Sequence, residues 1–165
     1  MAELQESALW LSAKDDGGSL DDPDLRYLFG YWRRAAGDGV VPHRREIDPP
    51  IDLPGFLPTT IMFNVERGAG GGMGFRYRLL GTRLAEFAGR DVTGMTIQEA
   101  FGDDITARDR EIYERVVGEV ICYSGQRISL IHSRQFFERY RRLVMPVRGD
   151  DSGRVDMIWI WLKFA

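Results

Sequence analysis

The sequence is poor in the residues from which many protein sites are built. It contains one cysteine, Cys122, and two histidines, His43 and His132, among 165 residues. A single cysteine cannot form an internal disulfide, which fits a reducing compartment. The two histidines fall in different predicted elements and show no recognisable metal-ligand spacing. We therefore expect no metal site.

Long apolar runs are also absent. The longest, residues 157–162, is far shorter than the roughly 20 apolar residues of a membrane-spanning helix. The N-terminus shows no basic segment followed by an apolar one, so no signal peptide is predicted. The formal net charge is −3, which creates no overall field to recruit nucleic acid or acidic membranes. These absences predict a cytoplasmic protein that binds neither nucleic acid nor membrane.

Signatures of nucleophilic catalysis are missing too. Serine or cysteine catalysis needs a nucleophile beside a base, and neither a Gly-x-Ser-x-Gly segment nor a Cys/His signature is present. The glycine-rich segment 68–74 lies between two predicted strands. A phosphate-binding loop would instead lie between a strand and a helix, whose first amides hold the anion. We therefore predict a hairpin turn at 68–74 and no enzyme.

Hydrophobic residues make up 44% of the chain and charged residues 28%, which is ordinary for one globular domain. We divide it into three parts. Residues 1–22 form a tail or a short helix, residues 23–58 a helix and a proline-rich connector, and residues 59–165 the core. Pro23 suits the first position of the helix, which should end near residue 36. Its apolar stripe, at helical spacing, consists of Leu25, Leu28, Phe29 and Trp32.

Alternation of apolar and polar residues predicts the strands of the core. They are expected at residues 59–66, 75–80, 126–133, 138–148 and 154–164. Helices should cover residues 82–88, 96–101 and 105–120, and the Thr82 hydroxyl should cap the first of them. This order predicts an α+β fold with a five-stranded antiparallel sheet, helices on one face and the N-terminal amphipathic helix outside this core. The last strand is almost continuously apolar, so it should be central.

Six short motifs follow one another along the chain. They are Tyr31-Trp32-Arg33, Pro42-His43-Arg44, Asp48-Pro49, Leu57-Pro58, Tyr-Arg-Leu-Leu-Gly-Thr at 77–82 and Gly-Arg-Asp-Val-Thr-Gly at 89–94. Together they resemble a family of small bacterial single-domain PAS proteins, over roughly residues 24–164. The glycine-rich turn at 68–74 is longer than in that family. The resemblance implies a PAS fold and a sensory role, with no settled ligand and no catalytic residues.

PAS domains close over a small cavity between the sheet and the short helices. The resemblance therefore implies a ligand site in the corresponding place here, between the second strand, the helices and the closing strands. The residues we expect at this site are Arg78, Tyr77, Thr82, Phe87 and Tyr113. Aromatic walls with one arginine suit a small organic anion that has an apolar body.

Arg78 lies within the best-matched motif and admits two interpretations. It could bind the head of the anion, or it could be a structural arginine paired with Glu86 or Asp91. A buried guanidinium without an anion is costly, so we expect one partner or the other.

The sequence identifies no cofactor. His132 alone could hold a haem, but an exposed or satisfied histidine is the ordinary alternative. Cys122 lacks the Asn-Cys-Arg-Phe-Leu-Gln type of segment that flavin-binding PAS proteins share, which favours a structural thiol. Basic and aromatic residues alternate near the end of the chain, a pattern that can bind single strands of nucleic acid but also fits a hairpin with two faces. They are Arg134, Phe136, Phe137, Arg139, Tyr140, Arg141 and Arg142.

We therefore expect a non-enzymatic PAS-type sensory or interaction module. A ligand would shift the packing of helix on sheet, and the signal would pass to a separate signalling protein. The stripe of Leu25, Leu28, Phe29 and Trp32 would be exposed in a lone chain, which predicts a homodimer. Two alternatives remain: a structural homodimerisation module without a ligand, and a cone-fold enzyme of the ketosteroid-isomerase type. The enzyme would need an acid or base in an apolar cavity, and the sequence offers no clear one.

Overall fold

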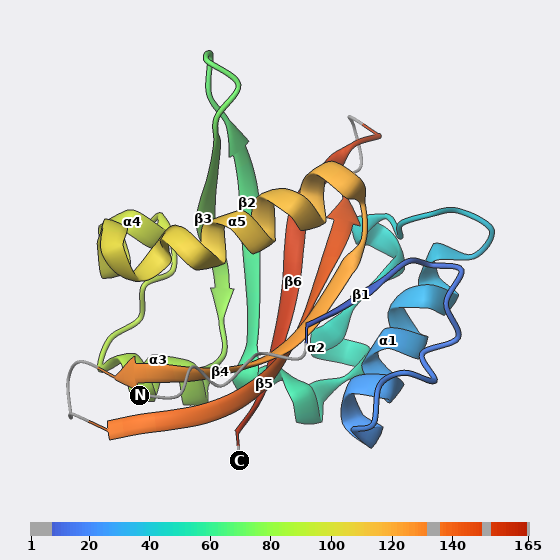
Figure 1. Ribbon diagram of the computed structural model, residues 1–165, viewed down its shortest axis with the longest axis horizontal. Coiled ribbons are helices and arrows are strands. Elements are labelled where there is room, and N and C mark those ends of the chain that lie inside the picture. The colour runs from blue at the N-terminus through green and yellow to red at the C-terminus, as the bar shows by residue number, and fades with distance from the viewer. Residues whose placement is uncertain (1–7, 132–135, 150–152, 165) are drawn as a thin grey trace.

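Six antiparallel strands form one sheet in the computed structural model, which describes residues 8–131, 136–149 and 153–164 (Figure 1). Their order across the sheet is β1-β4-β5-β6-β2-β3. The strands are β1 Leu9–Leu11, β2 Thr60–Arg67, β3 Met73–Leu80, β4 Cys122–Ile131, β5 Phe136–Arg148 and β6 Val155–Phe164. The α+β class and the five predicted strands are confirmed, and β1 adds a sixth.

Strand β1 lies where we expected a tail or a short helix. Leu11 pairs with Cys122, so β1 occupies the edge of the sheet beside β4. Leu11 and Leu20 are buried. Three extended residues suffice here because β4 offers an unpaired row of backbone donors and acceptors. Residues 1–7 lie outside the described residues.

Helices cover both faces of the sheet (Figure 1). On one face lie α3 Thr82–Ala88, α4 Ile97–Phe101 and α5 Asp103–Glu119, and on the other lies α1 Pro23–Ala36. Strand β6 has strands on both sides, and its side chains alternate between the two helical layers. The ring of Trp159, for example, meets Tyr31 of α1 edge-on at 5.8 Å. Coverage of both faces explains why β6 is almost continuously apolar, and its predicted interior position is confirmed.

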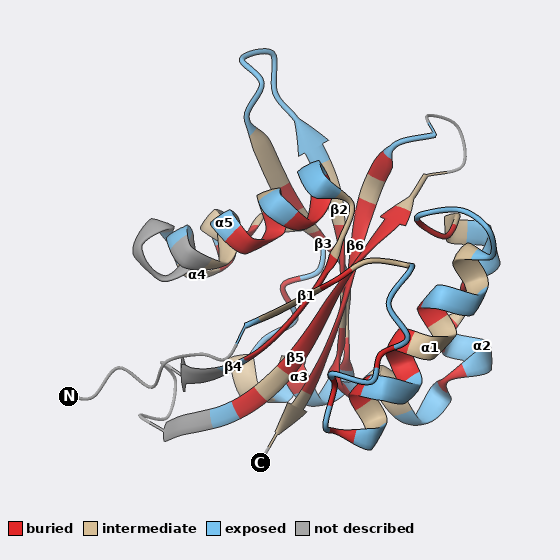
Figure 2. Ribbon diagram, turned by 45° about the vertical axis from the view of Figure 1, so that its right-hand side comes forward, coloured by how far each residue is buried: buried red, intermediate tan, exposed pale blue. Residues whose placement is uncertain are grey.

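Helix α1 packs on the sheet within the single chain (Figure 2). The Asp22 side chain caps it by accepting from the amides of Asp24 and Leu25. The indole Nε1 of Trp32 donates to the carbonyl oxygen of Pro146 at 2.8 Å. All four residues of the apolar stripe are buried, namely Leu25, Leu28, Phe29 and Trp32. The expectation that this stripe is exposed is therefore wrong, and the homodimer that we built on it stays a prediction without that support.

The proline-rich connector from α1 to β2 contains three short helical turns. They are η1 Arg44–Glu46, α2 Pro49–Asp52 and η2 Pro54–Thr59. Prolines occupy the first positions of α2 and η2, where no backbone N–H is needed. The Tyr31 hydroxyl ties α2 to α1, donating to Asp52 Oδ2 at 2.6 Å and accepting from the Asp48 amide at 3.0 Å. No helix among the described residues is both long enough and apolar enough to cross a bilayer.

The Leu57-Pro58 and Gly-Thr motifs pack against each other. A methyl group at Gly81 would overlap the carbonyl oxygens of Leu57 and Pro58. Gly81 also donates its amide to the carbonyl oxygen of Thr60 at 2.8 Å. Glycine is therefore required by the close approach of two backbones, since its φ of −58° is open to any residue.

Candidate functional site

An aromatic cluster fills the space between the sheet and α5. The ring centroid of Phe63 lies 4.6 Å from that of Tyr77 and 5.4 Å from that of Tyr113. Phe75 lies 5.5 Å from Tyr113. The structure thus brings together two of the five predicted site residues, Tyr77 and Tyr113, and both are buried.

The other predicted residues lie apart from this cluster. Phe87 of α3 packs on Phe164 at 4.9 Å, and the guanidinium of Arg83 lies 5.5 Å from the Phe87 ring. Thr82 is exposed. The expected cap by its hydroxyl is wrong, because Gly81 occupies the N-cap position and makes no side-chain cap.

Arg78 is exposed and lies at a β-bulge. Tyr77 pairs with Phe63 while Leu79 pairs with Met62, so Arg78 is the extra residue that has no partner on β2. The strict alternation predicted from Phe75 to Leu79 is therefore wrong beyond Tyr77.

Exposure also removes the argument that Arg78 must have an anionic partner. Among the described residues it forms no ion pair with Glu86 or Asp91. Its role as a ligand residue remains a hypothesis.

The Gly-Arg-Asp-Val-Thr-Gly motif closes a loop onto the outer edge of β3. Asp91 Oδ1 accepts from the amide and the hydroxyl of Thr93 at 2.9 and 2.6 Å. Gly94 adopts a φ of +89° and donates its amide to the Tyr77 carbonyl oxygen at 2.8 Å. The Tyr77 amide donates to the Met95 carbonyl oxygen at 2.9 Å. The motif therefore has a structural role, which is to pair the free edge of β3 beside the aromatic cluster.

A buried arginine, Arg142 of β5, is the polar centre of this region. Its side chain is 2% exposed, and its Nη1 lies 2.8 Å from Asp109 Oδ1 on α5. The guanidinium lies 5.9 Å from the ring of Tyr113 and 5.4 Å from that of Tyr123. Its Nε is buried and has no hydrogen-bond partner among the described residues. We call Arg142, Asp109, Tyr113 and Tyr123 the Arg142 cluster.

The sequence pattern did not single out Arg142 or Asp109. We had grouped Arg142 with Arg141 in an alternating basic segment, but Arg141 instead pairs with Asp21 at 3.0 Å. The register of β4 and β5, which only the structure provides, places Arg142 opposite Gly125, a residue without a side chain. The side chain of Tyr123 lies in the space where a Cβ at Gly125 would be.

Burial is the main cause of the pKa shifts of the tyrosine and cysteine side chains in this region. Burial raises the pKa of the Tyr113 phenol well above its usual value, and the charge of Asp109 raises it further against the opposing effect of Arg142. Burial likewise raises the pKa of the Tyr77 phenol. The Cys122 thiol is fully buried in β4, and burial raises its pKa too. A buried thiol of raised pKa is a poor nucleophile, which agrees with the structural role predicted for Cys122.

No group of three or more metal-ligating side chains occurs in the part of the chain that the structure describes. The haem hypothesis for His132 concerns a residue outside the described residues. The side chains of Arg134, Phe136 and Phe137 are likewise outside the description. Tyr140, by contrast, is buried.

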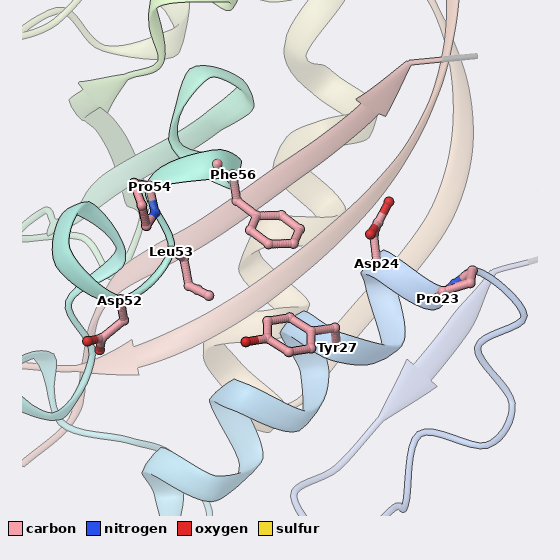
Figure 3. Close-up of a pocket in the computed structure, with 8 residues that line it drawn as sticks. Pro23, Asp24, Tyr27, Asp52, Leu53, Pro54 and Phe56 are labelled. Carbon is pink, nitrogen blue, oxygen red and sulfur yellow. The ribbon is translucent and has the colours of Figure 1, made fainter.

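A groove of about 390 Å³ lies on the opposite face of the sheet, between the start of α1 and the turns α2 and η2 (Figure 3). The rings of Tyr27 and Phe56 are stacked there, with centroids 5.9 Å apart and an angle of 7° between their planes. Phe56 in turn meets Trp161 edge-on at 5.1 Å. The residues that line the groove are Pro23, Asp24, Tyr27, Asp52, Leu53, Pro54, Gly55 and Phe56.

One of three comparisons with known proteins identifies a family for this chain. No curated protein matches this chain. A solved structure described as that of an RNA-binding Light-Oxygen-Voltage Receptor is similar at 13% sequence identity and a TM-score of 0.47. The match covers 76% of this chain and 36% of the receptor chain. The model of the family described as PAS domain matches residues 20–154. This match spans most of the chain, which therefore belongs to the PAS domain family.

Proposed function

We propose that this PAS domain senses a small organic anion at the Arg142 cluster and signals to a partner protein. The observation that carries the proposal is the buried guanidinium of Arg142, which binds Asp109 through Nη1 and whose buried Nε has no hydrogen-bond partner in the described part of the chain. A buried donor without an acceptor is costly, and a ligand carboxylate would satisfy it.

The aromatic residues around Arg142 favour a ligand with an apolar body. Tyr113 and Tyr123 lie beside the guanidinium, and Phe63 and Tyr77 continue the apolar wall. Burial of such a body supplies the affinity, while the charge-assisted contact to Arg142 supplies the selectivity for an anion.

The proposed signal is a shift of α5 on the sheet. The ion pair between Arg142 and Asp109 joins β5 to α5, and the two residues are 33 positions apart in the chain. An anion on Arg142 competes with the Asp109 carboxylate. It therefore stabilises an arrangement in which α5 is held less tightly, which is a shift of population and not a chemical step.

Thermal unfolding with a panel of small aromatic carboxylates tests the proposal, with the matching uncharged amides as controls. A ligand at a hundred times its dissociation constant adds about 2.7 kcal/mol to the free energy of unfolding. In a domain of this size that raises the melting temperature by about 5–11 °C. We expect Arg142→Met to lose this shift while Arg78→Met keeps it.

Arg142→Lys provides a second variant in case Arg142→Met does not fold. It keeps the charge but loses the planar fork, so the shift should fall in part. An undiminished shift in a folded Arg142→Met protein would place the anion elsewhere. The absence of a shift with every carboxylate, together with no bound molecule in native mass spectrometry, would favour a module without a ligand.

A further inference from the structure

The groove between α1 and the connector combines an exposed aromatic ring with carboxylates. Tyr27 is 54% exposed although it stacks on Phe56. Asp24 and Asp52 flank the two rings in the close-up (Figure 3). The groove lies on the face of the sheet opposite Arg142, because Phe56 contacts Trp161 whereas Arg142 pairs with the next residue, Leu162.

The two carboxylates differ in their partners. Asp24 Oδ2 is bound by the ammonium of Lys163 at 2.8 Å, and Lys163 also binds Asp22 at 2.9 Å. Asp52 accepts a hydrogen bond from the Tyr31 hydroxyl but forms no ion pair among the described residues. Asp52 is thus an exposed carboxylate that the Tyr31 hydroxyl holds in place and that no cation of the described residues neutralises.

Exposed apolar side chains occur on the same segments of the chain that form the groove. The large hydrophobic side chains that are exposed in the described part of the chain are Tyr27, Val40 and Ile51. All three belong to α1 or the connector, and Ile51, 75% exposed, directly precedes Asp52. Tyr27 within the groove and Ile51 next to Asp52 thus place exposed apolar side chains at a groove with polar edges, which is typical of a site where another protein binds.

A guanidinium fits this combination better than other polar groups. It stacks on aromatic faces, it forms two parallel hydrogen bonds with a carboxylate, and it loses less by leaving water than an ammonium does. An anion would be repelled by Asp52 and by the pair Asp22 and Asp24, whose two carboxylates share the one ammonium of Lys163. The exposed Ile51 favours an arginine carried on a protein segment, because a free cation would leave the Ile51 side chain in water.

We propose that the groove docks an arginine of a partner protein, with its guanidinium stacked on Tyr27 and hydrogen-bonded to Asp52, and with apolar neighbours of that arginine covering Ile51. The proposal takes from the proposed function only the premise that this domain acts through a partner protein. The docking site is separate from the Arg142 cluster, so each can fail without the other.

Fluorescence anisotropy with a labelled peptide of alternating arginine and leucine tests the docking, with a glutamate–leucine peptide as the negative control. Tyr27→Leu should weaken binding of the arginine peptide about two- to fivefold, whereas Tyr27→Phe keeps the ring and should bind as the unchanged protein does. Asp52→Asn, which can still accept from Tyr31, should also weaken binding about two- to fivefold. Asp38→Asn makes the same charge change at another exposed site and should have no effect.

Several outcomes would overturn the docking proposal. Equal effects of Asp38→Asn and Asp52→Asn would mean unspecific attraction of charge, and equal affinity for arginine amide and for the peptide would mean a site for a free cation. A dimer in sedimentation that Tyr27→Leu dissociates would make a second copy of the chain the occupant. Absence of peptide binding refutes the docking but leaves the thermal shift with carboxylates, and thus the sensing proposal, intact.

Discussion

Removing Asp109 should destabilise the protein strongly, because it leaves the Arg142 charge without its partner. The Arg142 side chain is 2% exposed and that of Asp109 is 17% exposed, so water cannot replace the lost carboxylate at the guanidinium. Breaking a buried ion pair from one side costs about 3–5 kcal/mol. For a domain of this length, Asp109→Ala should therefore lower the melting temperature by about 6–20 °C.

Removing Arg142 instead of Asp109 should lower the free energy of unfolding by less. Arg142→Met removes the buried charge and keeps much of the bulk of the side chain, and Asp109, whose side chain is 17% exposed, lies nearer to solvent than Arg142 does. The double variant Asp109→Ala/Arg142→Met should cost clearly less than the sum of the two single variants, since it leaves neither of the two charges in the interior. The coupling of the two sites is thus large and measurable by a double-mutant cycle.

Urea unfolding followed by tryptophan fluorescence measures these free energies, because four tryptophans report on the core. Glu119→Ala is the matched control on the same helix. Its side chain pairs with Arg115 at the surface, so its loss should cost less than about 1 kcal/mol. A cost below about 1 kcal/mol for Asp109→Ala, or additive effects in the double variant, would refute the view that this pair is a buried connection between α5 and the sheet.

Two further predictions concern the packing and the charge of the fold. Gly81→Ala would push a methyl group into the carbonyl oxygen of Pro58, so it should lower the free energy of unfolding in urea by about 1–3 kcal/mol. Gly118→Ala in α5, whose added methyl group would meet no neighbour, should leave this free energy unchanged or raise it. Equal effects of the two variants would contradict the close approach at Gly81. Burial alone would raise the pKa of Asp22, but hydrogen bonds from Lys163 and from backbone amides outweigh it and lower this pKa. The stability that Asp22 supplies is therefore present above the pKa of the unfolded carboxyl, 3.8, and is lost as the pH falls through the folded pKa. Asp22→Asn should then flatten the acid side of the curve of melting temperature against pH, and an unchanged acid side would show that the carboxylate is not held by these bonds.

Local sequence patterns determined most of the element boundaries. Alternation placed the core strands, and β6 was recognised as interior because its residues are apolar without interruption. The spacing of its apolar residues and Pro23 at its first position predict helix α1. These signals are local, because the side chains of a helix or a strand return to the same face at a fixed spacing in the sequence. That spacing does not depend on which other element packs against the face.

The bulge at Arg78 shows where such local signals fail. Alternation predicted one face for Phe75, Tyr77 and Leu79, but pairing with β2 inserts Arg78 as an extra residue. A bulge is set by the register of two strands, and the sequence of one strand does not contain that register. The same holds for β1, whose three residues are a strand only because β4 has a free edge to pair with.

By itself, then, the sequence determined the types and the order of the elements from α1 onward that form the core and, through the motifs it shares with its family, the fold. The tertiary structure decided which faces and which charges are buried. The apolar stripe of α1 is buried because the chain folds this helix back onto the sheet. Arg142 is the polar centre of the candidate site, and the neighbouring Arg141 pairs with Asp21 near the surface, although the two arginines look alike in the sequence. Burial of a charge depends on a partner brought from elsewhere in the chain, and only the packing of α5 on the sheet supplies Asp109.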